Sequence, residues 1–309
     1  MKTKTFIIIV TYNGVKWLSK CLNSCIPYSV VLVDNNSNDD TIKFVSKNFP
    51  KVTILKQNKN LGFGAANNIG ISYALNNDAA YIFLLNQDAY LESKTIEDLI
   101  EIHKQNTDFG ILSPIHLNGN GKKLEYDFSK YLSVNKELLY DAIKNSFTKQ
   151  SYDVPFVNAA AWLIPKTTFE KVGGFDPIFF HYGEDDNYCQ RILFHNLRKG
   201  IIPKTYIFHD REKKIKQKKI SGTKNLEYYE RSYKQRFANI NIQMESYIVK
   251  LKQYLMKLVL KHLLKLNFNK ALFEIKKYKL LNDLLPEIKK SRKKNRNEGL
   301  HYLNSKQNI

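Results

Sequence analysis

Short apolar runs alternate with helical patterns in the first third of the chain. Residues 6–10 and 30–33 are continuous and rich in β-branched side chains, as in strands buried on both faces. Residues 52–55 and 81–85 repeat the pattern. Because strands and helices alternate, we expect an α/β fold with a mostly parallel central sheet and helices on both faces.

Polar clusters follow three of these runs. Residues 11–14 read Thr-Tyr-Asn-Gly, residues 34–40 combine Asp, Asn and Ser, and residues 86–88 read Asn-Gln-Asp. In sheets of this kind, ligands bind beyond the carboxyl ends of the strands. The three clusters are therefore predicted to belong to one ligand site.

A glycine-containing segment follows the third run. Residues 62–67 read Gly-Phe-Gly-Ala-Ala-Asn, whereas a dinucleotide fingerprint has a third glycine in place of Asn67 and follows the first strand. We favour a loop that lets the backbone approach a ligand and that opens a helix whose N-terminus attracts phosphate. An ordinary turn is the alternative.

Acidic residues in two places are candidates for chemistry. Asp88 fits a site for a hard cation that takes further ligands from substrate phosphates, although a turn-forming role is the alternative. Glu184, Asp185 and Asp186 are adjacent, and their mutual repulsion raises a carboxyl pKa towards that of a general base. The alternative is an acidic first turn that complements a helix dipole. His209, after the last apolar run, is a metal ligand or a structural residue.

The net charge of +20 is unevenly distributed. Residues 211–309 hold 26 Lys and Arg against 8 Asp and Glu, whereas residues 1–210 hold 23 against 21. Aromatic residues are not interleaved with the basic ones as on a nucleic-acid-binding strand platform, so we expect no nucleic-acid partner.

The basic part begins with a run, residues 211–219, that we expect to be a loop. An amphipathic helical pattern with a lysine stripe follows at 243–266, and a basic cluster at 289–296 lies near an end expected to fray. Together they favour peripheral contact with an anionic membrane, at the inner face of the cell membrane. A helix packed on the catalytic domain with a solvated lysine face is the alternative.

Cysteine usage and hydropathy indicate the compartment. The three cysteines form no C-x-x-C pair and are odd in number, which fits a reducing cytosol. The N-terminal apolar run is too short for a signal peptide, and no stretch is long enough for a membrane span. The sequence predicts a cytoplasmic protein.

Five motifs in order make the chain recognisable. They are residues 10–14, 33–39, 60–70, 85–88 and 180–191. Together they resemble the family 2 inverting glycosyltransferases with the GT-A fold, and most of all the rhamnosyltransferase-like enzymes of bacterial polysaccharide assembly.

The resemblance implies roles for individual residues. Asp185 would be the general base and Glu184 its acceptor-orienting partner, while Asp88 and His209 would bind Mg²⁺ or Mn²⁺. The family's D-x-D motif reads Asn-Gln-Asp here, so its first acid is missing. The residues implied in binding the nucleotide are Thr11, Tyr12, Asn13, Asp34, Asn36, Asn67 and Asn86. Trp162 falls where an acceptor sugar often stacks, with a core position as the alternative.

The implied activity is that of a metal-dependent inverting glycosyltransferase of the hexosyltransferase type. Its donor would be a dTDP- or UDP-linked sugar, such as rhamnose or another hexose, and its acceptor a saccharide or lipid-linked saccharide of surface polysaccharide assembly. A catalytically silent protein that binds sugar nucleotides is the alternative. We expect a GT-A catalytic domain at residues 1–215 and a basic, mainly helical extension at 216–309.

Overall fold

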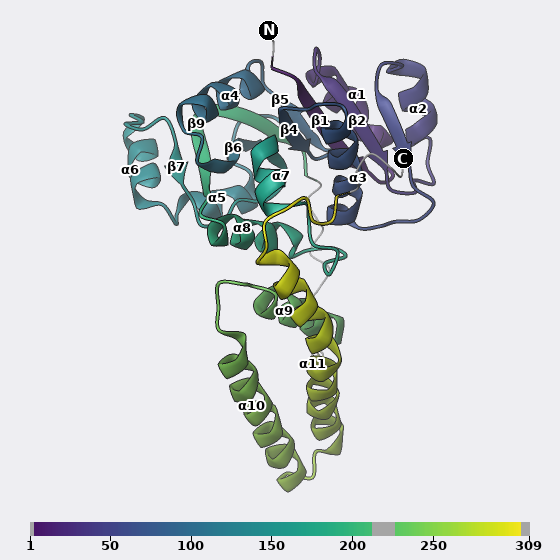
Figure 1. Cartoon of the computed structure of the whole chain (residues 1–309), viewed down its shortest axis with the longest axis vertical. Coiled ribbons are helices and arrows are strands. Elements are labelled where there is room, and N and C mark those ends of the chain that lie inside the picture. Colours follow the sequence, from purple (N-terminus) through teal and green to yellow (C-terminus); the bar gives the residue numbers. More distant parts are fainter. Residues whose placement is uncertain (1–2, 212–225, 304–309) are drawn as a thin grey trace. The chain divides into compact units, whose positions relative to one another are not determined.

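The structure is a computed structural model that describes residues 3–211 and 226–303 (Figure 1). The chain divides into two compact units. One comprises Met1–Lys213 together with Glu298–Ile309, and the other comprises Lys214–Asn297. The first unit contains the sheet, and the second contains helices.

One half of the sheet is parallel, as the sequence predicts. The strands β1 (Thr5–Thr11), β2 (Ser29–Asp34), β3 (Thr53–Lys56) and β4 (Tyr81–Leu85) lie in the order β3-β2-β1-β4. Each neighbouring pair in this half is parallel. Their carboxyl ends therefore meet at one edge, as the proposed site requires.

The other half of the sheet is mixed. It consists of β8 (Ala161–Pro165), β6 (Phe109–Asn118), β9 (Arg198–His209) and β5 (Ala89–Leu91), in that order from β4, with β7 (Tyr152–Asp153) also paired to β9. β8 runs antiparallel to both β4 and β6, and β5 runs antiparallel to β9. β6 and β9 are parallel to each other.

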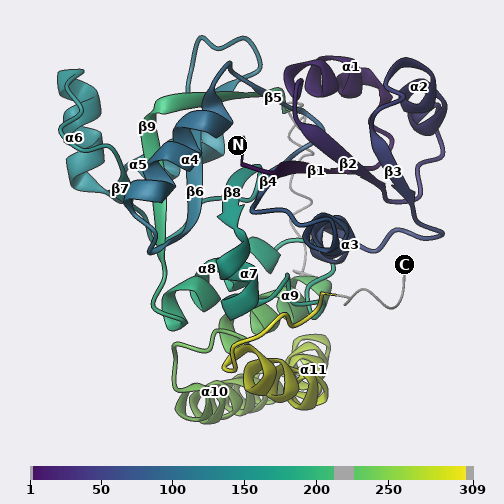
Figure 2. The same ribbon diagram turned by 45° about the horizontal axis from the view of Figure 1, so that its top comes forward.

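Helices cover both faces of the sheet (Figure 2). Strand residues alternate between the faces, so that Ile7 and Ile9 belong to one apolar cluster and Ile8 to the other. The Ile7 face is covered by α1 (Val15–Ser24), α2 (Thr41–Asn48) and α4 (Thr95–Gln105). The Ile8 face is covered by α3 (Phe63–Asn76), α5 (Tyr126–Leu132), α6 (Lys136–Lys144), α7 (Lys166–Val172) and α8 (Glu184–Phe194).

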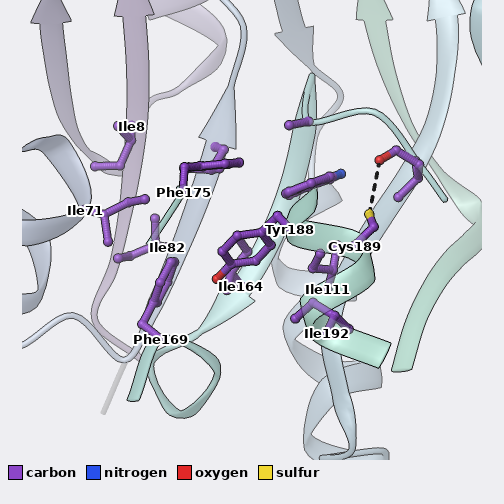
Figure 3. Close-up of a cluster of buried hydrophobic side chains, with 14 of the residues drawn as sticks. Ile8, Ile71, Ile82, Ile111, Ile164, Phe169, Phe175, Tyr188, Cys189 and Ile192 are labelled. Atoms are coloured by element: carbon purple, nitrogen blue, oxygen red, sulfur yellow. Dashed lines mark hydrogen bonds between the residues drawn. The ribbon is translucent and has the colours of Figure 1, made fainter. Parts of the chain in front are cut away.

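The cluster on the Ile8 face joins strands to helices (Figure 3). Ile8 and Ile82 come from neighbouring strands, and Tyr188 comes from α8. Trp162 is fully buried in the same cluster and stacks on Phe175 with ring centroids 6.1 Å apart. Of the two roles considered for this tryptophan, the structure selects the core position.

The helical unit has its own apolar core. It contains α9 (Leu226–Phe237), α10 (Met244–Leu264) and α11 (Phe268–Asn295). Within the amphipathic pattern predicted at 243–266, Leu255 and Val259 are buried, but Leu266 lies beyond the end of α10 and is exposed. Among the described residues, no helix combines the length and apolarity that crossing a bilayer needs.

The basic cluster at 289–296 is not frayed, contrary to expectation. It lies mostly within α11, where Arg292 and Asn295 are buried. The Arg292 guanidinium donates to the backbone oxygens of Phe237 (3.0 Å) and Ile242 (2.8 Å). Part of this cluster therefore has a structural role. Of the predicted basic loop 211–219, only its first residue lies within the described part of the chain.

The end of the described chain returns to pack within the first unit. Gly174 N donates to His301 O at 2.8 Å, and Lys171 forms an ion pair with Glu298 at 3.8 Å. The Arg191 guanidinium lies over the Tyr302 ring, 5.6 Å from its centroid. No sequence pattern suggested this return of the chain.

Candidate functional site

Gln87 joins the ends of β1 and β4. Its Oε1 accepts hydrogen bonds from Thr11 Oγ1 (2.7 Å) and from the Tyr12 backbone N–H (3.0 Å). A Cβ on Gly14 would lie 2.3 Å from the same oxygen, so a larger residue there would displace the Gln87 amide. Tyr12 is 45% exposed. These contacts leave the Tyr12 ring accessible beside a fixed backbone, which suits stacking on a nucleotide base.

The loops after β1 and β2 are hydrogen-bonded to each other. Asn13 N donates to Ser37 Oγ (2.9 Å), and Asn38 N donates to Asn13 Oδ1 (2.8 Å). The buried Asp34 carboxylate accepts from Ser37 N at 3.2 Å. Asn36 adopts a positive φ of 69° within this turn. The structure thus brings three of the predicted nucleotide-binding residues, Asn13, Asp34 and Asn36, into one pair of joined loops that continues from Thr11 and Tyr12.

The loop before α3 lies against the loop before α8. Gly62 has φ +80°, and a Cβ there would lie 1.8 Å from the carbonyl oxygen of Phe180. A Cβ on Gly64 would lie 3.4 Å from that of Glu184. The N-termini of α3 and α8 therefore approach each other closely. Asn67 is buried in α3, and its Nδ2 donates to Phe63 O (2.9 Å) within the same helix.

Asp88 and His209 lie side by side because β5 and β9 pair with Ala89 opposite His209. The His209 Nε2 atom is 3.3 Å from Asp88 Oδ1, without the geometry of a hydrogen bond. The histidine side chain is fully buried, whereas that of Asp88 is 19% exposed. Burial opposes ionisation of Asp88, but His209 and Arg211 hold the pKa of its carboxyl below its usual value.

The donor atoms at this pair fit a divalent cation. Both ring nitrogens of His209 are buried without a hydrogen-bond partner, which is costly unless something else satisfies them. A carboxylate oxygen and an imidazole nitrogen suit Mn²⁺, and Mg²⁺ accepts the oxygen. Among the described residues, no group of three or more His, Cys, Asp or Glu side chains could hold a metal. The protein thus offers two ligands, and a bound diphosphate would have to supply others.

Arg211 extends this charged region. Its guanidinium forms an ion pair with Asp127 and lies 3.6 Å from Glu125 Oε1. The charges of both Asp185 and Arg211 act on the Tyr131 hydroxyl, so this hydroxyl lies near both groups. Burial is the main reason that the pKa of this hydroxyl is raised. In the sequence Arg211 only begins a basic run, and nothing local indicates its acidic partners.

The three adjacent acids form the first turn of α8, after Gly183 at φ 107°. Burial, reinforced by the charge of Asp186, raises the pKa of Asp185 to about 6. Burial and the charge of Asp185 raise the pKa of Glu184 to about 7. Glu184 Oε2 is buried without a hydrogen-bond partner. Desolvation therefore outweighs the favourable field of the helix N-terminus at both groups.

The segment before β8 connects the two groups of acids. Asn86 N donates to Ala160 O at 3.0 Å, and the backbone of the adjacent Ala159 stabilises the ionised form of Asp185. Asp185 and the polar triplet that ends in Asp88 therefore lie on the same edge of the sheet. Gln87, which the sequence marks only as the neighbour of an acid, is the residue of this triplet whose side chain accepts from both Thr11 and the Tyr12 backbone.

Comparisons with known proteins point to one family. The model described as Glycosyl transferase family 2 matches residues 6–173. The chain is 26% identical to dTDP-rhamnosyl transferase RfbF of Shigella flexneri over 212 residues, 68% of this chain and 70% of that protein. It is 24% identical to the N-acetylglucosaminyl-diphospho-decaprenol L-rhamnosyltransferase of Mycobacterium tuberculosis over 231 residues, 66% of this chain and 75% of that protein.

Solved structures share the fold at low sequence identity. Staphylococcus aureus TarS 1–349 in complex with UDP-GlcNAc superposes with a TM-score of 0.53 at 16% identity, covering 95% of this chain and 88% of that one. GalNAc-T7 with UDP, GalNAc and Mn²⁺ superposes with a TM-score of 0.54 at 15% identity. That match covers 79% of this chain, which spans about half (52%) of GalNAc-T7.

Proposed function

The chain belongs to glycosyltransferase family 2 and has the GT-A fold, and from this premise we propose that it transfers a sugar from a nucleoside diphosphate to a saccharide or lipid-linked saccharide with inversion. The observation that carries the proposal is the common edge of the sheet, where Asp88 with His209 and Glu184 with Asp185 lie around the Ala159–Ala160 backbone. We assign the reaction to the first unit, which contains most of the predicted catalytic domain at residues 1–215 and also includes the chain end from Glu298.

The donor nucleotide would bind at the joined loops after β1 and β2. The exposed Tyr12 ring supports stacking on the base, and the buried Asp34 carboxylate supports hydrogen bonding to the ribose. The relatives' names favour a dTDP-linked rhamnose, and the ligand of the TarS structure favours a UDP-linked hexose. We propose the thymidine-linked donor first and the uridine-linked donor second.

Asp185 would act as the general base. With a pKa of about 6, its carboxylate is largely ionised at neutral pH and still basic enough to accept a proton. It takes the proton from the acceptor hydroxyl as that oxygen bonds to the anomeric carbon and the bond to the diphosphate oxygen breaks. This single displacement inverts the anomeric configuration. Glu184, which is about half protonated at neutral pH, would in its protonated form donate a hydrogen bond that orients the acceptor.

Asp88 and His209 would hold a divalent cation, Mg²⁺ or Mn²⁺. When bound, such a cation neutralises negative charge on the departing diphosphate. The mutual contact of Asp88 and His209 positions both side chains before a donor arrives. Asp88, His209 and Arg211 are neighbours in space. This region therefore combines the proposed cation ligands with a positively charged side chain.

The same comparisons support a proposal for the biological setting. A relative that acts on a diphospho-decaprenol lipid supports a lipid-linked acceptor for this chain too. We propose a cytoplasmic reaction, at the inner face of the cell membrane, in the assembly of a bacterial surface polysaccharide.

A product-release assay tests the proposal. The full chain is incubated with dTDP-rhamnose or with UDP-hexoses, with and without Mn²⁺, and the released nucleoside diphosphate is measured. We expect release from one donor that requires the cation and that falls to background in Asp185→Asn. Donor binding is measured separately by thermal shift. If a donor binds but no donor releases its diphosphate, even when diverse acceptors are present, the chain is a silent binding protein.

A further inference from the structure

The turn between α10 and α11 exposes an apolar tip. Leu264 is 79% exposed, Leu266 is 76% exposed and Phe268 is 63% exposed. We use the name hairpin tip for residues 260–272, whose exposed apolar side chains are Leu260, Leu263, Leu264, Leu266, Phe268 and Leu272. Single exposed leucines are common on protein surfaces, but a run of this kind around one turn is characteristic of a contact surface.

The apolar side chains of the tip are not part of the core of the helical unit. That core uses Ile248, Leu255 and Val259 of α10 and residues such as Leu281 and Ile288 of α11, all of them buried. Figure 1 shows the two helices side by side and joined at this turn. Leu264, Leu266 and Phe268, which follow the last buried position of α10, are therefore largely outside the packing between the two helices.

Positive charge surrounds the tip. Residues 246–273 contain six lysines and no acidic residue. Four of these lysines are exposed at or beside the tip, namely Lys257, Lys261, Lys265 and Lys270. Within the described residues, no carboxylate lies within ion-pair distance of any of the four. The acids that flank this stretch are Glu245 at the start of α10 and Glu274, which is paired with Lys277 at 2.6 Å.

We propose that the hairpin tip binds the surface of an anionic lipid bilayer, with its apolar side chains in the interface and its lysines at the headgroups. Apolar side chains gain free energy on leaving water, and each lysine near an anionic surface adds attraction. This assigns the membrane contact to the tip and not to the basic cluster at 289–296, where Arg292 is buried and bonded to backbone oxygens.

The charge pattern selects the lipid surface over other partners. A second copy of this chain would bring the same unpaired lysines together, which is unfavourable at moderate ionic strength. A nucleic-acid backbone would attract the lysines but would leave the leucines in water. Only an anionic surface with an apolar layer beneath it satisfies both groups of side chains.

Vesicle co-sedimentation of the full chain tests this assignment. Vesicles of phosphatidylcholine are compared with vesicles that also contain phosphatidylglycerol. Two variants alter the tip: one combines Leu264→Ser, Leu266→Ser and Phe268→Ser, and the other combines Lys257→Gln, Lys261→Gln, Lys265→Gln and Lys270→Gln. A matched control removes four exposed lysines elsewhere, by Lys43→Gln, Lys47→Gln, Lys51→Gln and Lys104→Gln.

We expect the wild type to bind only the anionic vesicles, and each tip variant to bind at least about tenfold more weakly. The control should bind like the wild type, and added salt should weaken binding. The proposal is overturned by no preference for anionic vesicles, by tip variants that bind as the wild type does, or by an equal loss in the control. It is also overturned if the tip variants change only the oligomeric state.

A second measurement uses a single substitution, so it does not require a variant with several substitutions to fold. Phe268→Trp introduces a fluorescent side chain at the tip, and vesicles with brominated acyl chains quench tryptophans that reach the interface. Quenching in this variant beyond that of the wild type supports the proposal, and equal quenching in the two proteins overturns it. Neither measurement requires transferase activity, so the proposed function can fail while this inference stands.

Discussion

The His209 imidazole lies beside the Asp88 carboxylate, with Nε2 3.3 Å from Oδ1, because the register of two strands places His209 opposite Ala89. Asp210 N also donates to Asp88 O at 2.7 Å, which fixes the backbone on both sides of the pair. The pair is positioned by the sheet itself and not by a flexible loop. Its chemistry should therefore respond to side-chain substitutions that leave the fold intact.

His209→Gln should weaken the part of nucleotide binding that depends on the cation. The substitution removes one of the two proposed ligands, so we expect Mn²⁺ to add about tenfold less to the affinity for UDP or dTDP than it adds in the wild type. Titration calorimetry with Mn²⁺ and with EDTA measures the difference. If the variant loses the same affinity in both conditions, His209 supports the nucleotide and not the cation.

Asp185→Asn should remove catalysis and leave donor binding nearly intact. Asparagine keeps the size of the side chain but does not accept the proton, so we expect the transfer rate to fall by roughly 10²- to 10⁴-fold. Initial rates and donor affinity are measured on the same preparation. A variant with the full rate would show that the base lies elsewhere.

The loss of kcat/KM on the acidic side of the pH profile, its acid limb, should follow the protonation of the carboxyl groups in the first turn of α8. Glu184 and Asp185 have pKa values of about 7 and about 6, so kcat/KM should fall as the pH drops through this range and Asp185 takes up a proton. Asp186→Asn removes a negative charge that raises the pKa of Asp185. We therefore expect the limb to move to lower pH by roughly half a unit or more.

A matched control for the pH profile is Asp98→Asn, which removes an exposed charge on α4. This variant should keep the wild-type limb. A shift of equal size in both variants would mean that net charge, and not the contact within the first turn of α8, sets the titration.

Glu184→Gln should stabilise the protein at alkaline pH. The folded-state pKa of about 7 lies above the ordinary glutamate value of 4.5, so the folded state binds the proton more tightly and loses stability as the pH rises between these values. The full effect is of the order of 3 kcal/mol. A neutral glutamine avoids it, so Tm should rise by about 2 °C or more at pH 8 and change little near pH 5.

The exposed Glu92 provides the control for that measurement. Glu92→Gln makes the same chemical change in contact with solvent, so its Tm should follow that of the wild type at both pH values. An equal Tm for Glu184→Gln and the wild type at pH 8 would contradict the raised pKa.

Local patterns predicted the parallel half of the sheet because each of its strands is a short apolar run with a polar end. They did not predict β6 or the first part of β9. Pro114 interrupts β6, and Lys199 and Lys204 interrupt β9, although Lys199 is buried. Apolar periodicity marks a strand only where its own residues are regularly apolar. β6 and β9 interrupt that pattern and are held in the sheet by pairing with partners far along the chain.

The residues of the candidate site can be named from the sequence, but the contacts that connect them cannot. The side chains at 11–13 and 34–36 gather as expected, since parallel strands deliver them to one edge. The positions of Arg211 beside Asp127 and of Gln87 between two strand ends depend on long-range geometry that spacing does not encode. The burial of Trp162 follows from packing on both sides of β8 and has no local signal either.

The return of the chain after α11 makes the helical unit an insertion and not an appendage. Gly174 and Lys171 of the first unit depend on His301 and Glu298 for contacts. Cutting the polypeptide before α9 would therefore remove a structural component of the transferase along with the helices. An isolated catalytic fragment would need residues 298–303 supplied again, through a designed connection that replaces the excised helices.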